Sequence, residues 1–264
     1  MSPLRRRLDL ELVRRGLASS RERAQSDIAA GRVLVAGAVA DKAARLVAPG
    51  EPLQLLGPPP RFVSRGGEKL DAALDRFAVP VAGRTALDAG ASTGGFTDCL
   101  LQRGAASVLA VDVGHGHLDA RLRADRRVTV LERTNIRHLE LDEPVDVVVA
   151  DLAFISLRTV AGALAGAARP GGDLVVLVKP QFEAGRVEVS RGRGVVRGPE
   201  VWAAAVTGVQ TAFAAHGAVM MGLMVSPLLG AEGNVEFLAH LRRGEGAAGA
   251  VDVGAVVAEA ATRP

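Results

Sequence analysis

An apolar run that leads into a glycine-rich turn, at residues 85–96, constrains the fold of this chain more than any other feature. Residues 85–89 have the composition of a short buried strand, the turn contains Gly90, Gly94 and Gly95, and residues 97–103 follow with a helical pattern. A strand, a glycine loop and a helix in this order form the first unit of a nucleotide-binding α/β sheet. Glycines allow the backbone to approach a ligand closely, and the start of a helix presents unpaired N–H groups to it.

The spacing of these glycines distinguishes two classes of cofactor. A dinucleotide fingerprint requires G-x-G-x-x-G, whereas here Asp88-x-Gly90 is followed by Gly94-Gly95. This spacing resembles the S-adenosylmethionine (SAM) loop of class I methyltransferases. The next expected strand, residues 107–111, ends at Asp112, where a carboxylate suits a ribose diol; an ordinary surface-loop aspartate is the alternative. The candidate cofactor-binding residues are Asp88, Gly90, Ser92, Thr93, Gly94, Gly95, Phe96, Asp112 and Asp151.

Strand and helix patterns alternate through the following residues. Strands are expected at 128–131, 145–150, 173–178 and 218–225, and helices at 157–168 and near 200–216. This alternation predicts a doubly wound, mostly parallel α/β sheet. Residues 234–241 are expected to form the reversed strand of class I methyltransferases, which predicts a Rossmann-like fold with a seven-stranded sheet.

The first quarter of the chain is basic although the net charge is only +3. Residues 1–65 hold 12 of the 32 Lys+Arg and 6 of the 29 Asp+Glu, a balance of +6 that leaves −3 for the remainder. Such a module suits a phosphate-rich partner, and a solvated basic face is an equally good interpretation of charge alone.

Residues 1–56 form the first of four expected segments. Two short helices up to Gly31 and then short strands precede the stiff Gly57-Pro58-Pro59-Pro60, which indicates a linker at 57–64. Residues 5–56 resemble the αL RNA-binding domain of the ribosomal-protein-S-four type, whose helical pair presents arginines to structured RNA. The candidate RNA-binding residues are Arg14, Arg15, Arg21, Arg23 and Arg32, with Arg21 and Arg23 expected on exposed flanks of the second helix. A methyltransferase domain at 65–243 and a Gly/Ala-rich tail at 244–264 complete the division.

Four further segments carry a more specific resemblance. They begin at Ser64, Ala150, Val178 and Gly233 and have the sequences SRGGEKL, ADLAFIS, VKPQFE and GNVE. They are similar to the haemolysin-A (TlyA) family of rRNA methyltransferases across about residues 5–243. The resemblance implies the catalytic tetrad of ribose 2′-O-methyltransferases, which falls here on Lys69, Asp151, Lys179 and Glu236. It implies that Lys179 removes the 2′-hydroxyl proton, that Asp151 holds this lysine, and that Lys69 and Glu236 orient the hydroxyl.

The use of lysine supports this assignment independently. Only Lys42, Lys69 and Lys179 are lysines among the 32 cationic residues, and two of the three fall on the tetrad. A buried lysine can lose its proton, as a general base must, whereas arginine cannot.

The resemblance therefore implies methyl transfer from SAM to a cytidine ribose in ribosomal RNA of either subunit, with the oligomeric state left open. A membrane-active haemolysin and a catalytically silent RNA-binding protein are the alternatives. The chain departs from the family at Pro60-Arg61-Phe62-Val63, where a tryptophan-containing tetrapeptide is usual, so coupling between RNA and SAM binding at this junction stays open.

The remaining features concern the cellular compartment and metal binding. The single Cys99 forms no intramolecular disulfide, and neither a signal peptide nor a membrane span is evident, so we expect a cytoplasmic protein without membrane association. His115 and His117 lack further metal-ligand spacing, and no metal site is expected.

Overall fold

The computed structural model describes residues 5–18, 21–58, 60–184, 195–230, 232–244 and 251–262. The chain divides into two compact units, Met1–Ser64 and Arg65–Pro264. The linker expected at 57–64 thus groups with the first unit, and Phe62 and Val63 within it are buried.

The first unit is a small α+β domain. Its elements are β1 (Arg6–Arg7), α1 (Leu8–Arg14), α2 (Arg21–Ala29), β2 (Val33–Val35), β3 (Ala38–Val39), β4 (Leu46–Val47) and β5 (Leu53–Leu55). Strands β3, β2 and β5 form an antiparallel sheet, and β1 pairs with β4 in a short ladder that the sequence patterns did not indicate. Leu8 and Leu12 of α1 and Ile28 of α2 pack on Val33 and Val47, so burial of these apolar side chains joins the helices to the strands.

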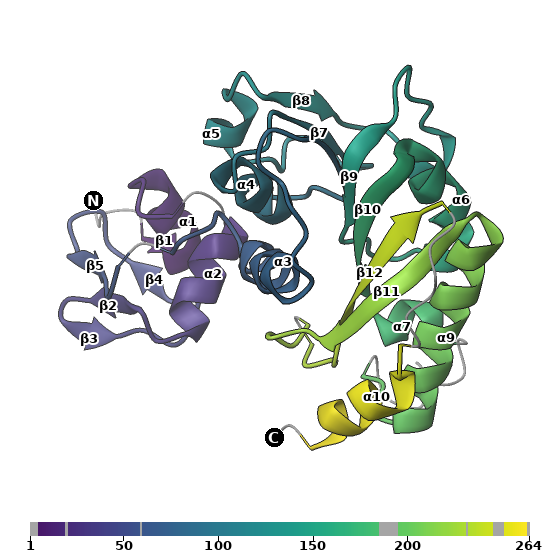
Figure 1. Ribbon diagram of the computed structural model, residues 1–264. Helices are drawn as coiled ribbons and strands as arrows, with labels where there is room; N and C mark the ends of the chain where they lie inside the picture. Colours follow the sequence, from purple (N-terminus) through teal and green to yellow (C-terminus); the bar gives the residue numbers. More distant parts are fainter. Residues whose placement is uncertain are drawn as a thin grey trace. The chain divides into compact units, whose positions relative to one another are not determined.

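The second unit contains a seven-stranded sheet in the order β11-β12-β10-β9-β6-β7-β8, in which only β12 is antiparallel to its neighbours. The strands are β6 (Thr85–Ala89), β7 (Ser107–Val111), β8 (Val128–Leu131), β9 (Val145–Ala150), β10 (Ala168–Val178), β11 (Ala218–Val225) and β12 (Phe237–Arg243). The helices are α3 (Arg65–Arg76), α4 (Gly95–Gln102), α5 (Ala120–Arg123), η1 (Ile136–His138), α6 (Leu157–Ala167), α7 (Pro180–Glu183), α9 (Pro199–Ala215) and α10 (Val253–Ala261). Helices α3 and α4 lie on one side of the sheet, and α6 and α9 lie on the other (Figure 1).

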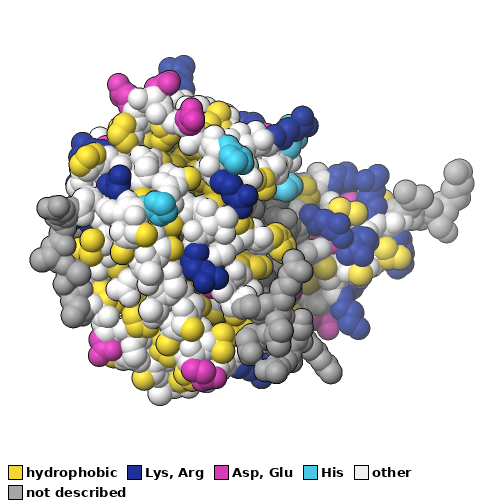
Figure 2. Space-filling view, turned by 90° about the vertical axis from the view of Figure 1, so that its right-hand side faces the viewer, with side chains coloured by type: hydrophobic (Ala, Val, Ile, Leu, Met, Phe, Trp, Pro, Cys, Tyr) yellow, Lys and Arg dark blue, Asp and Glu magenta, His cyan; other side chains and the backbone are white. Residues whose placement is uncertain are grey.

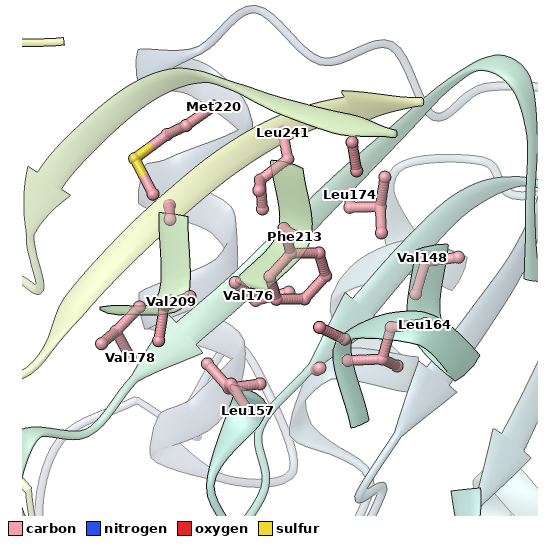
Figure 3. Packing of buried hydrophobic residues seen from close by; sticks show 14 of the residues in the cluster. Val148, Leu157, Leu164, Leu174, Val176, Val178, Val209, Phe213, Met220 and Leu241 are labelled. Atoms are coloured by element: carbon pink, nitrogen blue, oxygen red, sulfur yellow. The ribbon is translucent and has the colours of Figure 1, made fainter. Parts of the chain in front are cut away.

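Burial on both faces explains the composition of the central strands. β9 and the second half of β10 are runs of Val, Leu and Ala that are almost wholly buried, as expected for parallel strands covered on each side. Phe213 of α9 lies among side chains of α6 and the sheet, including Leu164, Val176 and Leu241 (Figure 3). This packing holds the carboxyl ends of the parallel strands at one edge.

The predicted fold class is confirmed, including the reversed last strand, although β12 begins at Phe237, three residues later than expected. The tail contains a helix, α10, that the composition did not indicate. Val257 and Ala260 of α10 are buried in the main core, where the helix packs on α9 and β11. Within the described ranges, no helix combines the length and the apolarity needed to cross a membrane.

Candidate functional site

Four candidate residues lie at the carboxyl ends of neighbouring parallel strands. Asp88 is the penultimate residue of β6, Asp112 follows β7, Asp151 follows β9 and Lys179 follows β10. Because these strands run in the same direction and are paired in this part of the sheet, their ends meet at one edge. Ligands of open α/β sheets bind at this edge.

The glycine loop is shaped by close contacts that exclude side chains. Gly90 has φ +86°, and a Cβ on it would lie 2.5 Å from the carbonyl oxygen of Asp151. Gly94 precedes α4 with φ +100°, and a Cβ there would lie 2.3 Å from a methyl group of Leu122. Only glycine suits both positions, because other residues rarely adopt this backbone conformation and have no room here.

The start of α4 offers hydrogen-bond donors to a ligand. In the part of the chain that the structure describes, the backbone N–H groups of Gly95 and Phe96 have no hydrogen-bond partner. The side chains of Thr93 and Phe96 are buried, so the backbone is what these residues offer a ligand. The first-turn N–H groups of a helix favour an anionic group such as a carboxylate.

Asp88 is a fully buried carboxyl group, and only one of its two oxygens has a hydrogen-bond partner among the described residues. Its Oδ2 accepts a hydrogen bond from Thr97 Oγ1 at 2.6 Å, whereas Oδ1 has no partner among the described residues. Burial raises the pKa of Asp88 to about 7, and the nearby charges of Asp151 and Asp112 act in the same direction. Three carboxylates therefore converge here, and they favour a cationic ligand and disfavour the pyrophosphate of a dinucleotide.

Asp112 anchors the loops around a neighbouring cavity. Its two carboxylate oxygens accept hydrogen bonds from the backbone N–H groups of Ser92 at 2.8 Å and Gly114 at 2.6 Å. This cavity is small and partly open, and its lining includes Ser92, Asp112, Gly114, His117, Val130 and Glu132. Each oxygen keeps a second lone pair, so Asp112 can still accept hydroxyl hydrogen bonds from a ribose.

Two lysine–carboxylate pairs stand at the same edge. Lys179 Nζ lies 2.5 Å from Asp151 Oδ1, and Lys69 Nζ donates to Glu236 Oε2 at 2.5 Å. Lys69 lies in α3, whereas Glu236 comes directly before β12. Val178 of β10 pairs with Phe237 of the antiparallel β12. Lys179, which follows β10, and Glu236, which precedes β12, therefore lie at neighbouring strand ends. All four predicted tetrad residues are thus brought to one edge of the sheet.

The lysines of both pairs are shielded from solvent. The side chain of Lys69 is 10% exposed and that of Lys179 is 14% exposed. Gly230 leaves room for Glu236, because a Cβ on Gly230 would lie 2.7 Å from Glu236 Oε1. Charged groups in such surroundings interact strongly and can exchange protons with a bound hydroxyl group.

Phe154 is a residue of this site that sequence reasoning missed. Its side chain is 93% exposed, and its backbone adopts φ +64°, which is rare for a bulky residue. Its ring lies 5.5 Å from that of Phe182, centroid to centroid, and Lys179 Nζ lies 5.9 Å from the centre of the Phe182 ring. The signal in the sequence was an aromatic residue between Asp151 and the helix start at Leu157, but its exposure could not be inferred.

The five candidate RNA-binding arginines all contact groups of their own unit. Arg14 and Arg15 pair with Glu11, Arg21 pairs with Asp9, and Arg23 pairs with Asp27. The expectation that Arg23 is exposed is wrong, because only 11% of its side chain is accessible once it packs against the buried Asp27. Arg21 remains 55% exposed.

Arg15 and Arg32 also bind backbone carbonyl groups. Arg15 donates to the carbonyls of Glu51, Ala48 and Pro49, and Arg32 donates to those of Leu56 and Pro58. Two residues outside the predicted set, Arg6 and Lys42, are exposed and have no ionic partner in the described ranges. On the face drawn in Figure 2, Lys and Arg side chains gather at the right of the view.

No group of three His, Cys, Asp or Glu side chains in the described part of the chain is arranged to hold a metal ion. His115 and His117 lie exposed in the loop after β7, where His115 Nε2 is 3.7 Å from Glu132 Oε2.

Comparisons with known proteins agree with this geometry. The family described as FtsJ-like methyltransferase matches residues 62–243, and the S4 domain matches residues 6–53. The chain is 51% identical over 242 residues to the 16S/23S rRNA (cytidine-2'-O)-methyltransferase TlyA of Mycobacterium tuberculosis, covering 90% of each protein. It is 37% identical to Hemolysin A of Brachyspira hyodysenteriae, covering 89% of this chain and 98% of that protein. A solved structure from Streptococcus thermophilus, whose name refers to a hemolysin, is 38% identical with a TM-score of 0.77 and covers 98% of this chain and 96% of its own.

Proposed function

The chain belongs to the TlyA family of FtsJ-like methyltransferases, and from this we propose that it transfers a methyl group from SAM to a cytidine ribose 2′-hydroxyl of ribosomal RNA. The observation that carries the proposal is the presence of the Lys179–Asp151 and Lys69–Glu236 pairs at one edge of the sheet, beside a glycine loop. A binding domain without activity has no need of two shielded lysines there.

The groups around the glycine loop fit SAM. The first-turn N–H groups of α4 suit its carboxylate, and Asp88 and Asp151 suit its ammonium and sulfonium charges. The partnerless oxygen of Asp88 is the feature that most clearly calls for a ligand, because a buried carboxylate oxygen without a hydrogen bond is costly. Asp112 would hold the ribose hydroxyls next to the cavity that it lines.

The chemical step requires the 2′-hydroxyl to lose a proton. SAM, when bound, supplies a methyl group on a sulfonium centre. A 2′-hydroxyl placed at this edge would accept that methyl group at its oxygen, and Lys179, as the amine, would take the hydroxyl proton. Asp151 holds Lys179 in place, while Lys69 and Glu236 orient the hydroxyl.

Phe154 offers a surface for the base of the target nucleotide. An exposed aromatic ring in a strained backbone conformation points to a role in binding a ligand, because such strain clusters at functional sites. The ring lies three residues from Asp151 and against Phe182, so a base stacked on it would place its ribose near Lys179.

The first unit would supply RNA affinity without chemistry. Its S4 domain match and its basic balance support contact with ribosomal RNA, and Arg6, Arg21 and Lys42 are among its exposed cations. The substrate implies action on ribosomal subunits in the cytoplasm. The predicted division at 1–56, 57–64, 65–243 and 244–264 is kept as a proposal, with α10 added to the catalytic unit.

Mass-spectrometric mapping of ribose methylation tests this function. Ribosomal subunits that lack the modification are incubated with the protein and SAM, and nuclease fragments are compared with a reaction without SAM. A new 2′-O-methylcytidine at a defined position is the expected result. SAM binding with no new ribose methylation in either subunit would contradict the assignment and favour the catalytically silent alternative.

A further inference from the structure

The two segments that carry Asp151 and Lys179 are joined by a second contact that the proposed reaction does not use. Residues 151–156 run from Asp151 to Ser156, which caps α6. Residues 179–183 run from Lys179 to Glu183 and include the short α7. The contact lies at the far ends of both segments, between Ser156 and Glu183.

Glu183 binds the start of α6 with both oxygens of its carboxylate. Ser156 Oγ donates to Oε2 at 2.5 Å, and the backbone N–H of Leu157 donates to Oε1 at 2.7 Å. Arg158 adds an ionic contact, with its Nε 3.5 Å from Oε2, and its guanidinium also donates to the Glu183 carbonyl at 3.2 Å. The first turn of α6 is therefore held directly by the segment that follows β10.

These contacts are made in a nearly solvent-free position. Glu183 is 6% exposed, and burial raises its pKa above the usual range while the hydrogen bonds from Ser156 and Leu157 act in the opposite direction. A carboxylate is also favoured at a helix start by the dipole of α6. Several groups thus converge on one buried side chain, four residues after Lys179, that the proposed reaction itself does not use.

The result is a closed frame of two segments. At one end the Lys179–Asp151 pair joins them at 2.5 Å, in the middle the rings of Phe154 and Phe182 are 5.5 Å apart, and at the other end Glu183 binds α6. We propose that Glu183 is a positioning residue that holds the segment of Lys179 against the segment of Asp151 and so sets the place of the Lys179 amine. The inference rests on the proposed role of Lys179 and deepens it.

The three lysines of the chain allow a test that does not depend on methyl transfer. Trace acetylation of the full-length protein, followed by peptide mass spectrometry, measures the reactivity of Lys179 and of Lys69 relative to the exposed Lys42. Wild type is compared with Glu183→Ala, Glu183→Gln and Ser156→Ala. Glu200→Gln is the matched control, because Glu200 is an exposed glutamate on neighbouring α9.

Glu183→Ala is expected to raise the Lys179/Lys42 ratio about fivefold or more through local opening, with the Lys69/Lys42 ratio unchanged. Glu183→Gln keeps an acceptor for Leu157 and should restore most of the protection, while Ser156→Ala should give an intermediate value. In single-turnover assays with rRNA, Glu183→Ala should lower the methylation rate about a hundredfold, the cost of a misplacement of about 1 Å, without changing the Kd of SAM. Glu200→Gln should match wild type in every measurement.

Equal Lys179 reactivity in wild type and Glu183→Ala would overturn the inference. A joint rise at Lys69 and Lys179 would also overturn it, because that pattern reports general loosening of the fold. If Glu183→Ala fails to fold, the Lys179/Lys42 and Lys69/Lys42 ratios of Glu183→Gln and Ser156→Ala test the inference in its place. A selective change at Lys179 in a protein that methylates no rRNA would leave the positioning role standing and reject the proposed function, so the two failures are distinguishable.

Discussion

Gly90 and Asp151 meet so closely that a Cβ on Gly90 would lie 2.5 Å from the Asp151 carbonyl oxygen. The backbone N–H of Gly90 also donates to the Val111 carbonyl at 2.8 Å, and that of Asp151 donates to the Ala89 carbonyl at 3.0 Å. The ends of β6, β7 and β9 are thus joined through the backbone of Ala89 and Gly90. The glycine loop and the segment that begins at Asp151 cannot move independently.

Gly90→Ala is expected to lower the free energy of unfolding by about 3 kcal/mol and to abolish measurable SAM binding, because it adds both a clash and a strained backbone. Gly83→Ala is the control, since Gly83 has φ +73° but no atom within 4 Å of its Cβ position. That change should cost only about 1 kcal/mol and leave SAM binding intact. Urea denaturation and calorimetry check both, and equal behaviour of the two variants would show that the close contact is unimportant.

Lys179→Arg tests the proposed role of Lys179 as the general base. Arginine keeps the positive charge but cannot take the hydroxyl proton, so the single-turnover rate should fall by two to four decades, roughly, with SAM affinity little changed. Lys42→Arg should leave the rate nearly unchanged, because a permanent positive charge can bind RNA phosphates as well as a lysine does in the basic unit. Near-normal rates for Lys179→Arg would show that Lys179 is not the base and that water removes the hydroxyl proton.

Asp88 predicts a pH dependence of stability in the absence of SAM. Its pKa is about 7 in the folded chain, above the usual value of 3.8, so between these values the folded state holds a proton that the unfolded state has lost. The free energy of unfolding should therefore fall as the pH rises from about 4 to about 7. Asp88→Asn should remove this part of the pH dependence and weaken SAM binding. Urea denaturation at several pH values checks the slope, and identical slopes for the two proteins would contradict the assignment.

Phe154 is expected to act in RNA-dependent steps only. Phe154→Asn replaces the ring with a residue that tolerates φ +64°, so the free energy of unfolding should change by less than about 1 kcal/mol. Loss of stacking should weaken productive binding of rRNA by about 1 to 3 kcal/mol, seen as a higher KM. Phe154→Tyr keeps the ring and should behave as wild type. A normal KM for Phe154→Asn would rule out the stacking role.

Arg21 and Arg23 should differ although they are neighbours on α2. Arg21→Ala is expected to weaken rRNA binding and to reduce its salt dependence by about one counterion, with little effect on stability. Arg23→Ala leaves the buried Asp27 without its nearest cation, so the free energy of unfolding should fall by about 1 to 3 kcal/mol. Filter binding at several salt concentrations and urea denaturation separate the two effects. Equal losses of rRNA affinity with unchanged stability would restore the view that both arginines face RNA.

The amino-acid sequence determined the local elements of this protein. The glycine loop after residues 85–89 and the alternation of strands and helices predicted the sheet, because backbone preference and hydrophobic periodicity depend on residues close in the chain. The pairing of Lys69 with Glu236, which are 167 positions apart, followed from family resemblance and not from any local pattern. The tail helix α10 was missed because its apolar side chains pack against α9 and β11, which are distant from it in the sequence.

Only the tertiary structure decided which charged and aromatic side chains are available. Arg21 and Arg23 have the same composition around them, yet one is exposed and the other is held by Asp27 in a buried position. Phe154 looks like a core residue in sequence and is almost fully exposed. The reason is physical: a side chain's partner and exposure depend on which distant segments fold against it, and residues near it in sequence carry little information about those segments.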